Sequence, residues 1–305
     1  MPILVDLSQI IMGGVIVNLT SELSKPGVDA KNLIQHMVYT SLLGIKKKFG
    51  KEYGEMILCA DSDSYWRRDY FQWYKGHRKH DKEKSDIDWT VVYSAIDVIK
   101  KDLNEYFPYK ILEVPNCEAD DIIACLTKYL QTNETKTSSL FIEDPQSIMI
   151  VSSDGDFPQL QIYKGVKQFD NQRKKFLVSK NPKKDLLEKI ASGDTGDNIA
   201  NILTSDMWSQ LRAENADEKM RQKSMKAALL EDLSERGALA CTNEEQRRNY
   251  IRNENLISFD KIPTHIYDSI IDSYKGYVKK GSTMKLMNYF TTNRMRLLFG
   301  SVSEF

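Results

Sequence analysis

The sequence predicts an α/β fold, in which a mostly parallel central sheet is flanked by helices and followed by a smaller C-terminal α-helical domain. Over roughly the first 160 residues, short β-branched runs alternate with longer stretches of helical periodicity, which is typical of a parallel sheet. After about residue 183, only short helices are expected, separated by turns rich in Gly, Pro and Asn. A chain of 305 residues, 41% of them hydrophobic, has room for one large domain or two.

Four strands and three helices are expected in the N-terminal part. Residues 29–49 place apolar side chains three and four positions apart, with lysines in the last turn and Gly50 as the expected C-cap. Residues 86–107 show the same spacing and stop before Pro108, and residues 118–130 show it again. The expected strands are 3–5, 56–59, 110–114 and 147–152. The expected C-terminal helices are 186–191, 205–212, 220–233, 244–255 and 265–272.

The composition excludes several classes of function. The 43 basic and 43 acidic residues cancel, which excludes a uniform electrostatic attraction to nucleic acid or to a membrane. No apolar run approaches the roughly 18 residues of a membrane span, and the N-terminus lacks the pattern of a secretory signal. The four cysteines form no CxxC pair, so neither a disulfide framework nor a zinc site is expected. We therefore expect a cytoplasmic protein that does not associate with membranes.

Acidic residues follow every expected strand. In an open parallel sheet, the carboxyl ends of the strands form the edge where ligands bind. A single acid there is often only a helix N-cap or a turn residue, but nine acids at one edge would repel one another strongly unless cations were bound. Oxygen ligands without His or Cys favour Mg²⁺ or Mn²⁺, and a pair of such ions is typical of phosphodiester hydrolysis. The nine acids are Asp6, Asp61, Glu118, Asp120, Asp121, Asp154, Asp156, Asp194 and Asp197.

A basic and aromatic segment begins just after Asp61. Between residues 66 and 84, seven basic residues stand against three acidic ones, with tyrosine, tryptophan and phenylalanine among them. Such a run is more commonly a solvated face, but its place beside the acids favours single-stranded nucleic acid, whose phosphates attract cations and whose bases stack on rings. Without a nearby thiol, His77 and His80 are expected to be solvated or to face phosphates. Nucleic-acid contacts are expected from Arg67, Arg68, Tyr74, Lys75, Arg78 and Lys79.

Five motifs, in this order, resemble the 5′ nuclease (flap endonuclease) superfamily, and within it the ribonuclease H group of T-even-like bacteriophages. They are Ile-Leu-Val-Asp6, Leu-Cys-Ala-Asp61, Cys-Glu118-Ala-Asp120-Asp121, Ser-Ser-Asp154-Gly-Asp156-Phe and Gly-Asp194-Thr-Gly-Asp197-Asn. Each motif is weak alone, whereas the ordered set is specific. The resemblance implies a magnesium-dependent 5′ to 3′ exonuclease and flap endonuclease, with Mn²⁺ able to substitute. It would degrade RNA in RNA/DNA hybrids and duplex DNA, and would remove lagging-strand RNA primers during phage replication.

The resemblance also implies a role for each site residue. A catalytic domain would span 1–182 and include a helical arch at about 62–90, and a DNA-binding helical domain would span 183–305. Lys75 in the arch would polarise the scissile phosphate and, with Asp6 and Asp154, form the catalytic set, while Arg78 would help draw the 5′ strand through. The first ion would be surrounded by Asp6, Asp61, Asp120 and Asp154, and the second by Asp156 and Asp197, with Glu118, Asp121 and Asp194 completing or orienting these shells.

One departure from the family pattern affects duplex binding. After Asp197-Asn, the chain continues Ile199-Ala-Asn-Ile-Leu-Thr, where cellular members have a Gly-rich hairpin that grips the duplex. Duplex anchoring is therefore assigned to Lys183, Lys184 and the basic helical region after them. By resemblance, the expected partners are RNA/DNA hybrids, 5′-flap and forked DNA, a sliding clamp, and a single-stranded DNA-binding protein docked on the basic C-terminal region. A monomer at the phage replication fork in the host cytoplasm is expected.

Three other interpretations remain. A haloacid-dehalogenase-like phosphatase needs a second Asp two residues after Asp6, where this chain has Ser8. A PIN-type ribonuclease shares several strand-end acids but would need neither the arch nor the C-terminal helices. A catalytically silent nucleic-acid adaptor would have lost some of the acids, whereas all nine are present.

Overall fold

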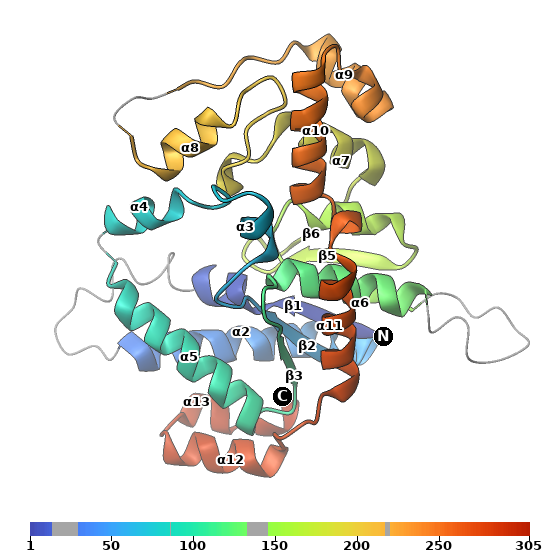
Figure 1. Ribbon diagram of the computed structural model, residues 1–305. Coiled ribbons are helices and arrows are strands. Elements are labelled where there is room, and N and C mark those ends of the chain that lie inside the picture. Colours follow the sequence, from blue (N-terminus) through green and yellow to red (C-terminus); the bar gives the residue numbers. More distant parts are fainter. Residues whose placement is uncertain (14–29, 86, 133–145, 217–219) are drawn as a thin grey trace, which may run out of the picture.

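A six-stranded sheet lies at the centre of the computed structural model, which describes residues 1–13, 30–85, 87–132, 146–216 and 220–305 (Figure 1). The strand order is β3-β2-β1-β4-β5-β6, with parallel pairing except for β6, which is antiparallel to β5. The predicted fold class and all four predicted strands are confirmed. The strands are β1 (Pro2–Asp6), β2 (Glu55–Ala60), β3 (Lys110–Glu113), β4 (Ile148–Val151), β5 (Val166–Asp170) and β6 (Lys175–Leu177).

Sequence reasoning missed the last two strands. Strand β5 interrupts its apolar residues with Lys167 and Gln168, and β6 has only three residues, so neither gives a clear β-branched run. The two strands form a hairpin, in which the buried Asp170 carboxylate accepts hydrogen bonds from the backbone N–H groups of Gln172 and Arg173, 2.9 Å away in each case.

Helices cover both faces of the sheet, and side-chain alternation along the strands explains why. In β1, Ile3 and Val5 point into one apolar core while Leu4 points into another, because successive side chains of a strand lie on opposite faces. The first core is closed by α2 (Ala30–Tyr53) and α5 (Trp89–Tyr106). The second is closed by α6 (Ala119–Thr132) and α11 (Thr264–Gly276).

The ends of these helices differ from the prediction in two places. Helix α2 continues through Gly50 and ends at Tyr53, so the expected C-cap was wrong; Gly54, with φ of +72°, follows the helix instead. Helix α5 begins at Trp89, where the Asp88 carboxylate accepts hydrogen bonds from the first-turn N–H groups. The starts predicted at residues 29 and 86 lie outside the described residues.

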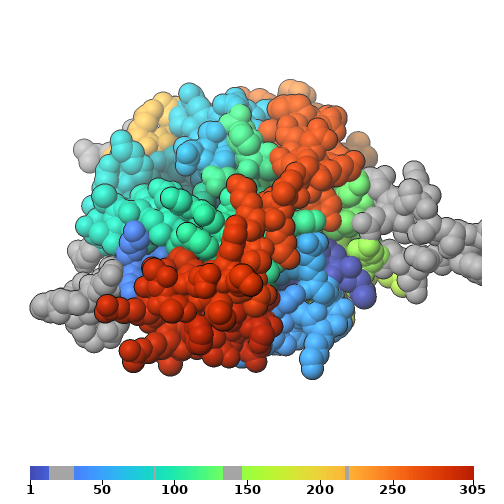
Figure 2. Space-filling model, turned by 90° about the horizontal axis from the view of Figure 1, so that it is seen from below, coloured from blue at the N-terminus to red at the C-terminus, as the bar shows by residue number. Residues whose placement is uncertain are grey.

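The last 23 residues belong to the α/β body by their packing. Helices α12 (Thr283–Thr292) and α13 (Arg296–Phe299), with the short 3-10 turn η6 (Val302–Glu304), cover one end of the body, as Figure 2 shows in red. Leu286, Phe290 and Phe305 share the core of α2 and α5, and the buried Asp102 carboxylate accepts a 2.7 Å hydrogen bond from the Tyr289 hydroxyl. The end of the chain therefore contributes to the same core as α2 and α5, while the division of function at residue 183 stays a prediction.

A separate apolar cluster forms the upper part of the molecule in Figure 1. It joins residues after the sheet to Phe71 and Tyr74 of the basic aromatic segment.

The predicted helix 220–233 begins only at Ala227. No helix in the described ranges has the length and hydropathy to cross a membrane. The elements of this region are α3 (Trp66–Tyr70), α4 (Arg78–Glu83), α7 (Pro182–Ser192), α8 (Met207–Ala213), α9 (Ala227–Arg236) and α10 (Glu244–Ile257), with 3-10 turns η2 (Phe157–Ile162), η3 (Thr195–Asp197), η4 (Gly237–Ala240) and η5 (Phe259–Lys261).

Candidate metal centre

Four carboxylates lie at the carboxyl edge of the parallel strands, and we call them the first acid group: Asp6, Asp61, Asp120 and Asp154. Asp6 ends β1, where its oxygens accept hydrogen bonds from the Gln9 N–H at 2.9 Å and the Ser152 hydroxyl at 3.1 Å. Asp61 follows β2 and accepts a 2.7 Å hydrogen bond from the Ala119 N–H, at the start of α6. Asp120 stands in the first turn of α6, and Asp154 follows β4. The sheet thus brings together acids that are far apart in sequence.

The charge of the first acid group is offset only in part, by Lys75, which acts on Asp120 without forming an ion pair with it. Burial, together with the charges of Asp61 and Asp154, raises the pKa of Asp6 to about 7. Burial, Asp154 and Asp6 likewise raise the pKa of Asp120 well above its usual value. Among the described residues, none of the four carboxylates forms an ion pair with a Lys or Arg side chain. Within the described ranges, no three of them bring their oxygens within 4.8 Å of one another.

Asp156, Asp194 and Asp197 form a second acid group, in which one oxygen of each carboxylate lies within 4.8 Å of the others. Asp156 precedes η2, and Asp194 caps η3 by accepting hydrogen bonds from the N–H groups of Gly196 and Asp197 at 2.8 and 3.2 Å. Gly193 permits this arrangement, because its φ is +70° and a Cβ there would lie 2.5 Å from the Ile199 carbonyl oxygen.

Three cations of the chain surround the second acid group. Lys189 of α7 forms an ion pair with Asp156, and its Nζ lies 3.0 Å from Asp194 Oδ2. Lys75 pairs with Glu118, and its Nζ lies 3.5 Å from Asp197 Oδ1, which also accepts a 2.9 Å hydrogen bond from Arg78. Burial disfavours the charged form of Lys75, but Asp197 and Glu118 outweigh it and raise its pKa. Sequence reasoning missed Lys189, whose place in the last turn of a short helix gives no chemical signal.

The two remaining acids have a structural partner, Arg67. The Arg67 guanidinium donates to Glu118 at 2.9 Å and pairs with Asp121 at 2.8 Å, while the Trp66 ring N–H donates to Asp121 at 3.1 Å. Asp121 is fully buried in this network, so it orients Arg67 and does not face the acidic edge. Burial raises the pKa of Glu118, but Lys75 and Arg67 outweigh it and leave the pKa lowered.

The structure corrects several expectations for the basic aromatic segment. Arg67 is 3% exposed and Tyr74 is 2% exposed, so the prediction that they contact nucleic acid was wrong: Arg67 anchors acids, and the Tyr74 hydroxyl lies 2.9 Å from Asp197 Oδ2. His77 is buried, not solvated, and burial together with Arg212 lowers its pKa. Of the residues expected to contact nucleic acid, Arg68, Arg78 and Lys79 are exposed, and Arg78 also contacts Asp197.

The segment expected to form the arch contacts η3 and the end of α8. The Arg78 guanidinium lies 3.3 Å from the Gly196 carbonyl oxygen, and a His80 ring nitrogen lies 3.1 Å from the Ala213 carbonyl oxygen. Lys75 has φ of +54°, a conformation that is costly for a residue with a side chain. Its N–H donates to the Asp197 carbonyl oxygen at 2.9 Å, which holds the strained backbone and directs the ammonium between Glu118 and Asp197.

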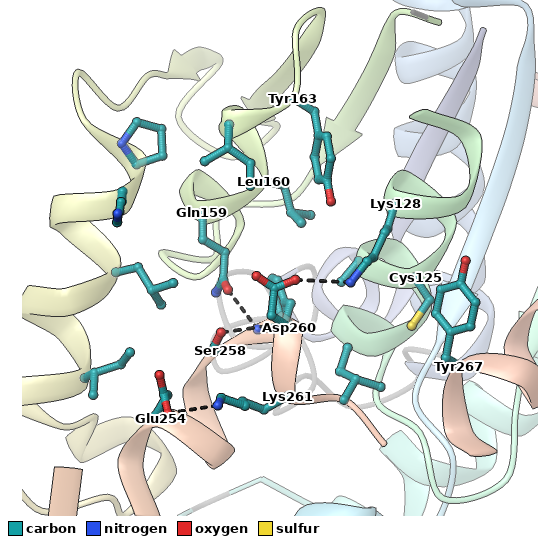
Figure 3. A pocket seen from close by; sticks show the side chains of 18 of the residues that line it. Cys125, Lys128, Gln159, Leu160, Tyr163, Glu254, Ser258, Asp260, Lys261 and Tyr267 are labelled. Atoms are coloured by element: carbon teal, nitrogen blue, oxygen red, sulfur yellow. Dashed lines mark hydrogen bonds and ion pairs between the residues drawn. The ribbon is translucent and has the colours of Figure 1, made fainter. Parts of the chain in front are cut away.

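A cavity of about 820 Å³ lies elsewhere, between α6, η2, α7 and the α10 to α11 connection (Figure 3). Its polar side chains bond mainly with each other and the wall: Lys128 pairs with Asp260 at 3.2 Å, and Lys261 with Glu254 at 3.0 Å. The lining contains none of the nine predicted acids. The chemistry that the sequence points to is therefore at the acidic edge of the sheet and not in this cavity.

The residues at that edge fit hard divalent cations. They offer carboxylate oxygens alone, and burial together with the negative charges of Asp61 and Asp154 raises the pKa of Asp6. Such oxygen sets bind Mg²⁺ or Mn²⁺ better than the softer metals.

Comparisons with known proteins find nucleases that are similar to this chain along nearly its whole length. A family described as 5′-3′ exonuclease, N-terminal resolvase-like domain, matches residues 14–190, and one described as T4 RNase H, C terminal, matches residues 180–305. The ribonuclease H of Enterobacteria phage T4 is 33% identical over 313 residues, covering 99% of this chain and 95% of that protein.

Solved structures show the same fold at low sequence identity. The phage T5 5′-exonuclease with bound zinc ions is 16% identical with a TM-score of 0.58, covering 90% of this chain and 97% of its own. A complex of the phage T5 flap endonuclease with DNA and metal ions is 12% identical with a TM-score of 0.56, covering 97% and 98%.

Proposed function

We propose that this chain, which belongs to the 5′-3′ exonuclease family and is similar to the ribonuclease H of phage T4, is a magnesium-dependent nuclease. It would act from 5′ ends. Its substrates would be RNA in RNA/DNA hybrids, duplex DNA, and 5′-flap or forked DNA, and its task the removal of lagging-strand RNA primers in phage replication. The observation that carries this proposal is the first acid group, whose four carboxylates converge on the ligand-binding edge of the sheet and raise the pKa values of Asp6 and Asp120 together with burial.

The ions would be held by the two acid groups. Asp6, Asp61, Asp120 and Asp154 would hold the first ion, with Mn²⁺ able to replace Mg²⁺, and the second group would hold a second. When bound, the ions would supply activation of the attacking water and charge stabilisation of the leaving oxygen. Glu118 and Asp121 would act indirectly, because Arg67 and Lys75 occupy their oxygens.

The chain's own cations would position the nucleic acid. Lys75 stands beside the acids on a backbone that its bond to Asp197 keeps rigid, so its ammonium can meet the scissile phosphate and stabilise charge that develops there. Arg78, Arg68 and Lys79 are exposed along the arch and would contact the phosphates of the 5′ strand.

The remaining parts of the proposal concern domains and partners. We assign catalysis to 1–182 and duplex DNA binding to the helical region from 183, including Lys183 and Lys184. The protein would act as a monomer in the host cytoplasm at the replication fork. The single-stranded DNA-binding protein would dock on the basic C-terminal region, and a sliding clamp is the other expected partner.

A cleavage assay tests this function. Purified protein is incubated with a 5′-flap DNA and with an RNA/DNA duplex, in Mg²⁺ and in EDTA. We expect release of short 5′ products from both substrates in Mg²⁺ and none in EDTA. Cleavage that persists in EDTA would rule out the metal mechanism. Tight binding without cleavage in Mg²⁺ or Mn²⁺ would support the nucleic-acid adaptor instead.

A further inference from the structure

Lys189 lies between two carboxylates of the second acid group, where its positive charge opposes their repulsion. Its Nζ bridges Asp156, which follows β4, and Asp194, which caps η3, although these acids come from different parts of the fold. The side chain is 25% exposed, so one end of this bridge faces solvent. Burial disfavours its charged form, but the two carboxylates outweigh burial and raise its pKa, so the ammonium stays charged at neutral pH.

The local fold holds Lys189 in this place. It lies in the last turn of α7, whose end is fixed by a 2.8 Å hydrogen bond from the Asn253 side chain to the Ile190 carbonyl oxygen. The chain then reverses at Gly193, so that Asp194 returns toward the helix it has just left. The end of α7 and the reversal at Gly193 thus keep the Lys189 ammonium and the Asp194 carboxylate facing each other.

The balance of charge differs between the two acid groups. Lys189, Lys75 and Arg78 contact the three carboxylates of the second group, which lie within 4.8 Å of one another. The four carboxylates of the first group have no such partners in the described part of the chain and do not converge as closely. Opposite charge between carboxylates lowers the cost of bringing them together, so the side-chain cations favour the compactness of the second group.

We propose that Lys189 is a resident counter-ion of the second acid group, and that a divalent ion binds there only by displacing its ammonium. This inference rests on the proposed metal-dependent function and adds a specificity-determining residue to it. The first group binds its ion with no competitor, whereas the second must release Lys189 from Asp156 and Asp194. Lysine suits this role because its flexible four-carbon stem can carry the ammonium into solvent. Ion affinity is therefore high at the first group and low at the second.

Mn²⁺ binding to the full-length protein without nucleic acid tests the proposal, with free Mn²⁺ followed by electron paramagnetic resonance. The test variant is Lys189→Met, which keeps the length of the side chain and removes its charge. The matched control is Lys184→Met, which removes the same charge from the same helix, where Lys184 pairs on the surface with Glu231. We expect Lys189→Met to tighten the weaker Mn²⁺ site by about tenfold or more, and to leave the tighter site within about twofold of wild type. Lys184→Met should leave both sites unchanged.

The other possible outcomes of the Mn²⁺ measurement each support or overturn the counter-ion role of Lys189. An unchanged or weakened second site in Lys189→Met would overturn the proposal, since Lys189 would then merely build the site or be irrelevant to it. If wild type and variants all bind no Mn²⁺, the proposed metal-dependent function fails, which is a different result. Should Lys189→Met fail to fold, as judged by circular dichroism in EDTA, Lys189→Gln takes its place with the same expectation. Lys189→Arg, which keeps the charge, should leave the second site weak.

Thermal unfolding gives an independent readout. Without Lys189, Asp156 and Asp194 repel each other in EDTA, so the variant should melt at a lower temperature than wild type. Saturating Mn²⁺ should recover most of that loss, because the ion takes over the charge that Lys189 supplied. A deficit that Mn²⁺ does not reduce would count against the counter-ion role.

Discussion

The two acid groups solve the same electrostatic problem in different ways, although Asp154 and Asp156 are only two residues apart. In the first group, buried and half-buried carboxylates lie near one another without an ion pair to a Lys or Arg of the described residues, and the pKa of Asp6 rises to about 7 as a result of burial and of its neighbours. In the second, Lys189, Lys75 and Arg78 offset the charge. The pKa of Asp197 is accordingly lowered: burial alone would raise it, but Lys75 and Arg78 outweigh burial. The compensation is uneven, because burial and the charge of Asp154 outweigh Lys189 at Asp156 and raise its pKa to about 7. The first group thus has fewer opposing charges than the second, which is only partly neutralised.

The largest expected effect comes from removing an acid of the first group. Asp154→Ala should lower turnover on a 5′-flap substrate by about 10³-fold or more while substrate binding is kept, because the variant loses a carboxylate that would hold the first ion. Single-turnover cleavage and a separate binding measurement in Ca²⁺ would check this. Asp268→Ala, which removes one exposed carboxylate on α11, is the control and should cleave normally. Near wild-type turnover in Asp154→Ala would remove that residue from the first ion's shell.

A smaller loss is expected at Lys75, which belongs to the charge balance of the second group and to the proposed contact with the scissile phosphate. Lys75→Ala should reduce kcat by about 100-fold or more, with a lesser change in KM, because charge stabilisation in the transition state is lost. Lys79→Ala removes an exposed charge from the same arch and should mainly weaken substrate binding. If Lys75→Ala changed KM alone, Lys75 would be a positioning residue for the 5′ strand.

The sequence predicted the first group well, because each acid sits at the end of a strong strand pattern, and parallel strands place their carboxyl ends at one edge. The side-chain networks behind the edge could not be predicted in the same way. Arg67 and Arg68 are adjacent in sequence and equally basic, yet Arg67 is buried between Glu118 and Asp121 while Arg68 is exposed. Only tertiary packing decides which of two neighbouring arginines is buried in ion pairs.

The same limit applies to Lys189 and to the C-terminal helices. Lys189 meets Asp156 through a reversal at Gly193, and nothing in the local sequence indicates which strand end it will face. Tyr289 and Phe290 have the periodicity of an ordinary amphipathic helix, which predicts that they are buried but not that they pack against α2 and α5. Both are long-range contacts, and periodicity reports only on local structure.

The smallest expected effect is on the pH dependence of stability, to which Asp6 of the first group and Asp156 of the second should both contribute, because the pKa of each is raised to about 7. The pKa of Asp6 is about 7 in the folded chain and near 3.8 when unfolded, so between these values the folded state keeps a proton that the unfolded state has lost. Stability should therefore fall as pH rises from about 4 to about 7 and level off above that. In EDTA, the melting temperature at pH 8 should be lower than at pH 5.5, with a difference on the order of 5 °C.

Asp6→Asn isolates this contribution, because it removes the titrating group and keeps its size. His77 changes stability in the opposite direction, because burial lowers its pKa and the folded state gains stability as pH rises toward 6.5. His77 is present in both wild type and Asp6→Asn, so its contribution cancels when their melting temperatures are subtracted. We expect the variant to show a flatter decline in melting temperature between pH 5.5 and 8 in EDTA. Mg²⁺ should stabilise wild type more at pH 8 than at pH 5.5, because protons compete with the ion for Asp6 below pH 7. A decline of equal slope in Asp6→Asn would show that the titration arises at other carboxylates with raised pKa values, such as Asp120 or Asp156, and not at Asp6.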